Sequence, residues 1–75
     1  SLYGYVDGRH TLVVNNHTAE AGTLTLLDVS GKVVYTSPFG VGFSRHDLSH
    51  LPAGVYIARL EASVRRATVK AITMK

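Results

Sequence analysis

The sequence predicts an all-β, antiparallel sandwich of about seven strands, and three observations support this fold class. Short runs with alternating apolar residues recur about every 8 to 12 residues, and Gly, Pro, Ser and Asn separate them. These runs are rich in Val, Ile, Thr and Tyr, whose branched or flat side chains fit a pleated surface better than a helix. No segment keeps a helical period of apolar residues, so helices are not expected.

The expected strands follow one another through short connections. They are Leu2 to Val6, His10 to Asn15, Thr23 to Val29, Lys32 to Thr36, Phe43 to Leu48, Gly54 to Glu61 and Arg66 to Met74. In the first of them, Tyr3 and Tyr5 share one face, because side chains alternate along a strand. These two tyrosines are the aromatic residues that we expect to be exposed.

Two turns are more specific than the strands. In the segment 28–32, Gly31 offers a positive φ between two apolar runs and Lys32 follows it, which predicts a tight hairpin. In Leu51-Pro52-Ala53-Gly54, Pro52 at the second position and Gly54 at the fourth favour a type I turn that starts the next strand. Alternation from this turn puts Tyr56 on the core face and Val55 on the other face.

The closing strand is rather long and is expected at a sheet edge, which the charges of Lys70 and Lys75 suit. Strict alternation puts Ala67 and Val69 on one face and Ile72 on the other. An edge strand presents unpaired backbone groups, onto which another protein can add a strand or a second copy can pair as a homodimer. The alternative is that the strand pairs only within its own sheet.

Length and composition exclude several classes of protein. A chain of 75 residues holds one domain at most. The net charge of +3 comes from scattered basic residues, clustered only at Arg65-Arg66, which does not form a nucleic-acid-binding stripe. The chain lacks cysteine, and its longest apolar run, Val55 to Ala58, is too short for a transmembrane segment. Because the chain starts at Ser1 and shows no signal-peptide pattern, we expect residues 1–75 to be one domain, a fragment of a larger protein.

Two histidines stand four residues apart, the spacing of zinc ligands on a helix. His46 and His50 lie where a strand is expected to run into a loop, and no glutamate stands between them. We therefore expect solvated loop histidines and no metal site.

Ser44, His46 and Asp47 supply the residue types of a hydrolytic triad. Neighbours on an extended chain point to opposite faces, so we expect no triad, no catalytic residue and no enzyme activity. The carboxylates are expected to cap turns rather than to form an acid/base pair. They are Asp7, Glu20, Asp28, Asp47 and Glu61. Gly40 and Gly42 lack the helix that a phosphate loop needs, so Phe39 to Phe43 is interpreted as a flexible connection without a cofactor.

From about Gly22 to Lys75, the order of elements resembles the type A C-terminal sorting domain of the type IX secretion system of Bacteroidota. Three stretches carry the likeness: an apolar strand with an Asp and Gly-Lys turn at 24–34, a "dls-l-paGvYil"-like signature at 47–57, and an alternating closing strand ending on lysine at 67–75. The first third of the chain matches less well, because the Pro-Asn-Pro-like opening motif of the family is missing.

The resemblance implies an immunoglobulin-like sandwich that directs its cargo through the outer-membrane translocon to the cell surface or the medium. It implies contacts with the translocon and with surface sortase-like components. It assigns recognition to Gly54, Tyr56, Val69, Lys70, Ile72 and Lys75, and structural turn roles to Gly31, Lys32 and Pro52. Two hypotheses stay beside it: an accessory carbohydrate- or protein-binding sandwich in which Tyr3 and Tyr5 touch the ligand, and a purely structural spacer or pilus-like subunit.

Overall fold

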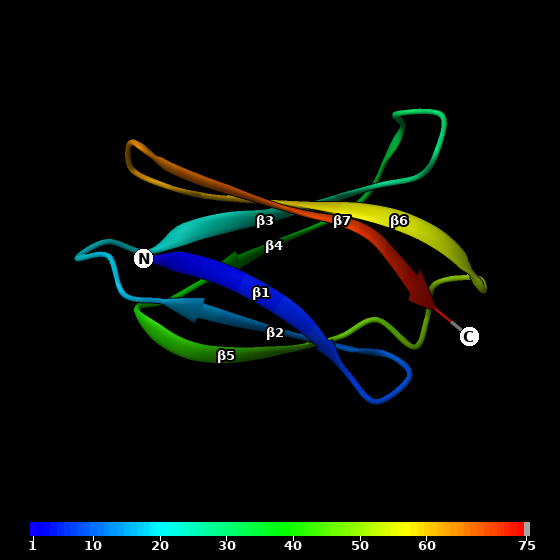
Figure 1. The fold of residues 1–75 in the computed structure, drawn as a ribbon, viewed down its shortest axis with the longest axis horizontal. Helices are drawn as coiled ribbons and strands as arrows, with labels where there is room; N and C mark the ends of the chain where they lie inside the picture. Colours follow the sequence, from blue (N-terminus) through cyan, green and yellow to red (C-terminus); the bar gives the residue numbers. More distant parts are fainter. Residues whose placement is uncertain (75) are drawn as a thin grey trace.

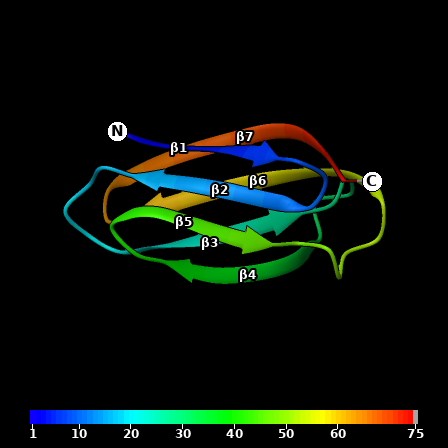
Figure 2. The same ribbon diagram turned by 90° about the horizontal axis from the view of Figure 1, so that it is seen from below.

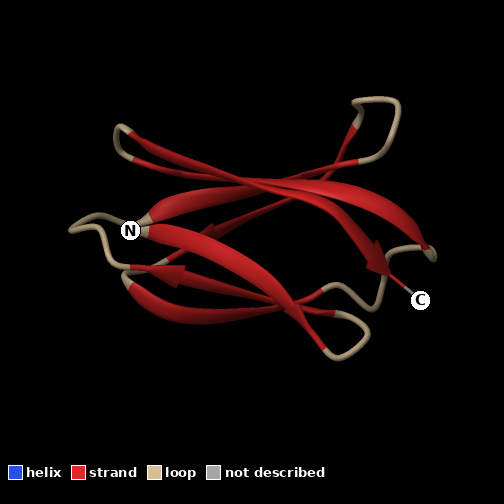
Figure 3. Cartoon of the chain, in the orientation of Figure 1, coloured by secondary structure: helices blue, strands red, loops and turns tan. Residues whose placement is uncertain are grey.

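The computed structural model describes residues 1–74, and the side chains at 69–71, 73 and 74 lie outside that description. Within this range the chain forms seven strands and no helix, as Figures 1 and 3 show. The strands are β1 (Leu2–Asp7), β2 (Thr11–Asn16), β3 (Gly22–Leu27), β4 (Val33–Phe39), β5 (Gly42–Asp47), β6 (Gly54–Ala62) and β7 (Arg65–Met74). Each expected strand corresponds to one observed strand, so the all-β prediction is confirmed.

Two antiparallel sheets form the layers of a sandwich. One sheet has the order β1-β2-β5 and the other β4-β3-β6-β7. The constant-type immunoglobulin fold groups its first, second, fifth and fourth strands in one sheet. Here the fourth strand lies at the edge of the other sheet, and the remaining strands keep the immunoglobulin grouping. The hairpin of β3 and β4 forms as predicted.

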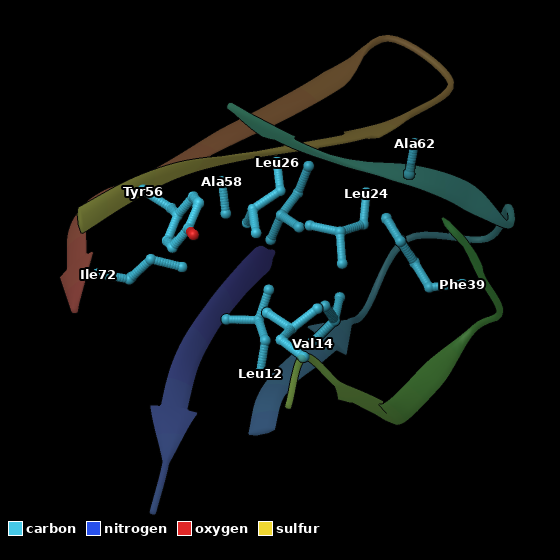
Figure 4. Close-up of a cluster of buried hydrophobic side chains, with 11 residues drawn as sticks. Leu12, Val14, Leu24, Leu26, Phe39, Tyr56, Ala58, Ala62 and Ile72 are labelled. Carbon is cyan, nitrogen blue, oxygen red and sulfur yellow. The ribbon is translucent and has the colours of Figure 1, made fainter. Parts of the chain in front are cut away.

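The core lies between the sheets, and Figure 4 shows side chains from both layers meeting there. Tyr56, Ala58 and Leu60 of β6 are buried, as the alternation from Gly54 predicts. They belong to one buried cluster with Leu12 and Val14 of β2, and Figure 4 shows Tyr56 and Ala58 on the layer opposite these two residues. Val55, on the other face of β6, is exposed.

The closing strand contains a β-bulge that sequence alternation does not reveal. Ile72 pairs with Tyr56, whereas Val69 pairs with Ala58, so two residues of β7 lie opposite the single residue Ile57. The extra residue changes the phase of the strand. Ala67 packs against the core and Ile72 is buried in it, so the expectation that they lie on opposite faces is wrong.

The outer edges of the two sheets come together on one side of the molecule. β7 is an edge strand of the larger sheet, as expected, and β1 is an edge strand of the smaller sheet. Figures 1 and 2 show β1 running beside β7, although the two strands belong to different sheets. At the opposite edge of the larger sheet, Pro38 lies within β4, and a proline blunts an edge because it has no N–H group to donate.

Candidate recognition site at the closing strand

The segment that leads into β6 is held by local hydrogen bonds. Asp47 Oδ1 accepts a bond from the Ser49 amide at 3.0 Å, and this bond is the main reason why the pKa of Asp47 lies below its ordinary value. The Leu51 amide donates to the Leu48 carbonyl at 3.0 Å. The hydrogen-bonded turn therefore spans Leu48–Leu51, three residues earlier than the turn predicted at Leu51–Gly54, because the Asp47 carboxylate organises the chain there.

Tyr56 connects this segment to the core. Its ring is buried, and its hydroxyl donates to the Pro52 carbonyl at 2.6 Å, which fixes the loop against the start of β6. Gly54 pairs with Met74 near the end of β7. A Cβ at Gly54 would meet the Tyr56 ring at ordinary contact distances of 3.8 Å, so packing does not require glycine at this position.

The hairpin between β3 and β4 matches its prediction in detail. Gly31 has a φ of 89°, and its amide donates to the Asp28 carbonyl at 3.0 Å. Asp28 Oδ1 accepts bonds from the Ser30 hydroxyl at 2.6 Å and from the Lys32 amide at 3.0 Å. These bonds, with the Ser30 hydroxyl first, lower the pKa of Asp28. Lys32 itself is exposed.

Of the residues predicted on β7, Ile72 is buried in the core, and it lies directly opposite Tyr56 in the pairing of β6 with β7. Val69 and Lys70 have defined places in the strand, but their side chains lie outside the described ones. Lys75 lies outside the described residues altogether. The structure therefore brings Gly54, Tyr56 and Ile72 together, and leaves Gly31 and Lys32 in a separate hairpin.

The residues of the rejected triad occupy both faces of β5. Ser44 Oγ lies 2.9 Å from His46 Nε2, because residues two apart on a strand share a face. Ser44 and His46 therefore meet, contrary to the expectation, whereas Asp47 is exposed on the other face and bonds to Ser49, so the three residues form no triad. His46 is buried, which lowers its pKa, so the expectation of a solvated loop histidine is also wrong. His50 is exposed, with its ring beside that of Tyr35.

The carboxylates are dispersed over the molecule. Asp7 pairs with Arg45 at 3.0 Å and Glu61 with Arg66 at 3.5 Å, while Asp28 and Asp47 cap turns. Within residues 1–74, no three potential metal ligands gather in one place. The same part of the chain contains no helix that could cross a membrane.

Asn16 is a structural residue that sequence reasoning missed. Its fully buried side chain donates to the Glu20 carbonyl at 2.8 Å and to the Gly40 carbonyl at 3.1 Å. Its Oδ1 accepts bonds from both the amide and the hydroxyl of Thr18. The amide thus joins two loops at one end of the sandwich. The pairing of two asparagines after an apolar run was the only available signal. The Gly40 carbonyl that Asn16 binds follows directly after Phe39. Phe39 is the last residue of β4 and its side chain is buried, so the interpretation of this residue as part of a flexible connection is wrong.

The structure defines a small antiparallel sandwich of seven described strands whose closing strand lies at a sheet edge. The family model for the secretion system C-terminal sorting domain matches residues 7–75. The chain belongs to this family, the C-terminal sorting domains of the type IX secretion system. The comparison with curated proteins gave no match.

Family membership gives the function that the resemblance implied. The domain is a C-terminal sorting signal that directs its cargo to the cell surface or the medium and interacts with the type IX machinery. The family is one of sorting signals and not of enzymes. No comparison supports the accessory carbohydrate- or protein-binding module that was kept as an alternative.

Proposed function

We propose that the type IX machinery reads this sorting domain through β7. The observation that carries the proposal is the position of β7: it is the closing strand and pairs only with β6 among the described strands. Its other edge is hydrogen-bonded to no described strand, and β1, which runs beside it, belongs to the other sheet; at this edge a partner strand adds, with backbone hydrogen bonds giving affinity and side chains giving specificity.

The recognition residues fall into two groups under this proposal. Gly54 and Tyr56 shape the segment against which β7 pairs, and Ile72 anchors β7 in the core. Val69, Lys70 and Lys75 supply contacts to the receptor. Gly31, Lys32 and Pro52 act structurally, by forming the hairpin and by accepting the Tyr56 hydrogen bond.

Three finer points complete the proposal. Residues 1–75 act as a single sorting domain carried by a larger exported protein, without catalysing a reaction. After transport, a surface sortase-like component is the second partner. The same edge of β7 pairs two copies as a homodimer when the receptor is absent, because an unpaired edge is a template for either partner.

The test fuses the domain to the C-terminus of a fluorescent reporter that is exported to the periplasm of a host with type IX machinery. We expect the intact fusion to reach the surface or the medium, and a fusion lacking residues 69–75 to stay in the periplasm. Because that deletion also removes Ile72 from the core, a Lys70→Ala/Lys75→Ala variant tests recognition with the anchor intact. Arg65→Ala, at the exposed start of β7, is the matched control and should be sorted normally.

The outcomes separate the general function from the reading mechanism. Periplasmic retention of the intact fusion would contradict the sorting function for this chain. Normal sorting of both the deletion and the double variant would leave the function in place and rule out recognition through β7. Circular dichroism of each purified domain shows whether a loss of sorting follows from a loss of the fold.

A further inference from the structure

The outward face of the β1-β2-β5 sheet carries an aromatic layer that lies apart from the recognition residues proposed on β6 and β7. The register places Tyr3, Asn15 and Phe43 in one row across the three strands, and Tyr5, Val13 and Arg45 in the next. Tyr3 and Tyr5 are 44% and 45% exposed and Phe43 is 68% exposed, which confirms the expected exposure of the two tyrosines. This sheet forms the lower layer in Figure 1. We refer to these two rows as the aromatic face.

The outward side chains of the central strand, β2, are buried although they point away from the core. Val13 and Asn15 are only 2% and 3% exposed. The rings of Tyr3 and Tyr5 lie nearly parallel, with centroids 6.5 Å apart and an angle of 21° between their planes. The flanking side chains therefore lie over β2 and present two aligned aromatic rings at the surface.

Beneath this layer lies an unpaired polar atom. Asn15 Nδ2 donates to the Tyr3 hydroxyl, but Asn15 Oδ1 has no hydrogen-bond partner among the described residues. A buried acceptor without a partner costs free energy, and native structures keep few of them. Such an oxygen needs a donor, and the half-exposed Tyr3 ring beside it can change rotamer to admit one.

The charges of the aromatic face disfavour an acidic ligand, because Asp7 and Asp47 lie in the next outward row of the sheet. Arg45 is the cation on the outward positions of these three strands, and its Nη1 pairs with Asp7 Oδ2 at 3.0 Å. An acidic ligand would have to compete with Asp7 for this guanidinium. A neutral ligand leaves the ion pair in place.

We propose that the aromatic face binds a neutral saccharide. A pyranose ring has an apolar C–H face, which packs on aromatic rings, and hydroxyl groups, which donate hydrogen bonds. Tyr5 and Phe43 contact the sugar face, and a sugar hydroxyl donates to Asn15 Oδ1 as the Tyr3 ring moves aside. The site lies on a different sheet from β7 and goes beyond the sorting function, so it does not depend on how that signal is read.

The first test exposes the labelled 75-residue chain to an array of neutral and acidic oligosaccharides. We expect binding to neutral members, and the Tyr5→Leu variant should lose roughly tenfold in affinity, about one good contact. Leucine keeps Val13 covered but removes the ring. Val33→Ala, which trims an exposed apolar side chain on the other sheet, is the matched control and should bind like the parent.

A second variant separates binding from folding. Asn15→Leu removes the unpaired oxygen and keeps a similar volume, so we expect the domain to melt at the same or a higher temperature while saccharide affinity falls roughly fivefold. Tyrosine emission can follow both titrations, since the chain has four tyrosines and no tryptophan. The proposal is overturned if the parent binds no neutral saccharide, if only acidic members bind, or if Tyr5→Leu and Asn15→Leu bind as tightly as the parent.

Discussion

Gly22, the first residue of β3, is a position where a single methyl group should damage the fold. A Cβ placed there would lie 2.2 Å from the Glu61 carbonyl oxygen on the neighbouring strand β6, and 2.6 Å from the Phe39 ring. Ordinary contact begins at 3.4 Å, so the two strands would have to separate by about 1 Å. The ring can turn away, but the carbonyl belongs to the backbone and cannot move alone.

The cost of Gly22→Ala follows from this overlap. Overpacking of a well-packed site costs about 1 to 3 kcal/mol, and weakening the nearby ladder bonds adds about 1 kcal/mol each. The unfolded chain returns about 0.4 to 1 kcal/mol, because alanine has less conformational freedom than glycine. We therefore expect a net loss of about 3 kcal/mol in the free energy of unfolding. For a domain of this size that corresponds to a fall of roughly 12 to 24 °C in melting temperature.

Gly40→Ala is the matched control for this prediction. A Cβ at Gly40 meets no atom within 4 Å, and the residue has no positive φ. Gly40→Ala should therefore raise the free energy of unfolding by about 0.5 kcal/mol, because alanine reduces the conformational freedom of the unfolded chain and meets no obstacle in the folded one. Thermal melts and urea titrations followed by circular dichroism measure both variants. If Gly22→Ala melts within about 3 °C of Gly40→Ala, the strands are not packed as described and the reasoning fails.

Four further predictions concern other parts of the sandwich. Tyr56→Phe removes the hydrogen bond to Pro52 and should cost about 1 kcal/mol in a urea titration, with an unchanged slope. Asn16→Asp sets a carboxylate against two carbonyls and should cost about 3 kcal/mol; a melting temperature equal to that of the parent would contradict the hydrogen bonds described. Ser63 has a φ of 56° in the β6–β7 turn, so Ser63→Gly should raise the melting temperature by about 2 to 4 °C, and a decrease would argue against strain there. Burial lowers the pKa of His46, so the unfolded chain takes up the proton first and stability should fall as the pH drops below about 6.5; His46→Gln should flatten this part of the profile.

The sequence predicts most of the fold because its signals are local. The spacing of apolar runs and turn residues is enough to place all seven strands, and Gly31 marks its hairpin directly. The core face of β6 follows from alternation after a single recognisable turn. Tyr3 and Tyr5 are likewise assigned to the surface from their place on an amphipathic first strand.

The parts that sequence reasoning missed depend on distant partners. His46 is buried because β5 pairs with β2 across the chain, and its neighbour Ser44 shares that inner face. Asn16 finds one of its acceptors 24 residues away, at Gly40. For the recognition site, the resemblance names the residues, but alternation alone separates Ile72 from Ala67, whereas both lie at the core.

The β-bulge in β7 makes the end of the domain sensitive to length as well as to composition. If the same residues paired regularly from Val69 onward, Ile72 would lie opposite Val55 and turn away from the core; the bulge absorbs the extra residue and returns Ile72 to the core face, opposite Tyr56. A partner strand that follows the first half of β7 in step would also fall out of step beyond the bulge. A residue added between Val69 and Ile72 would shift Ile72 out of phase again, whereas loss of the extra residue would leave a regular ladder with Ile72 still opposite Tyr56, so this segment should tolerate substitution and shortening by one residue far more readily than insertion.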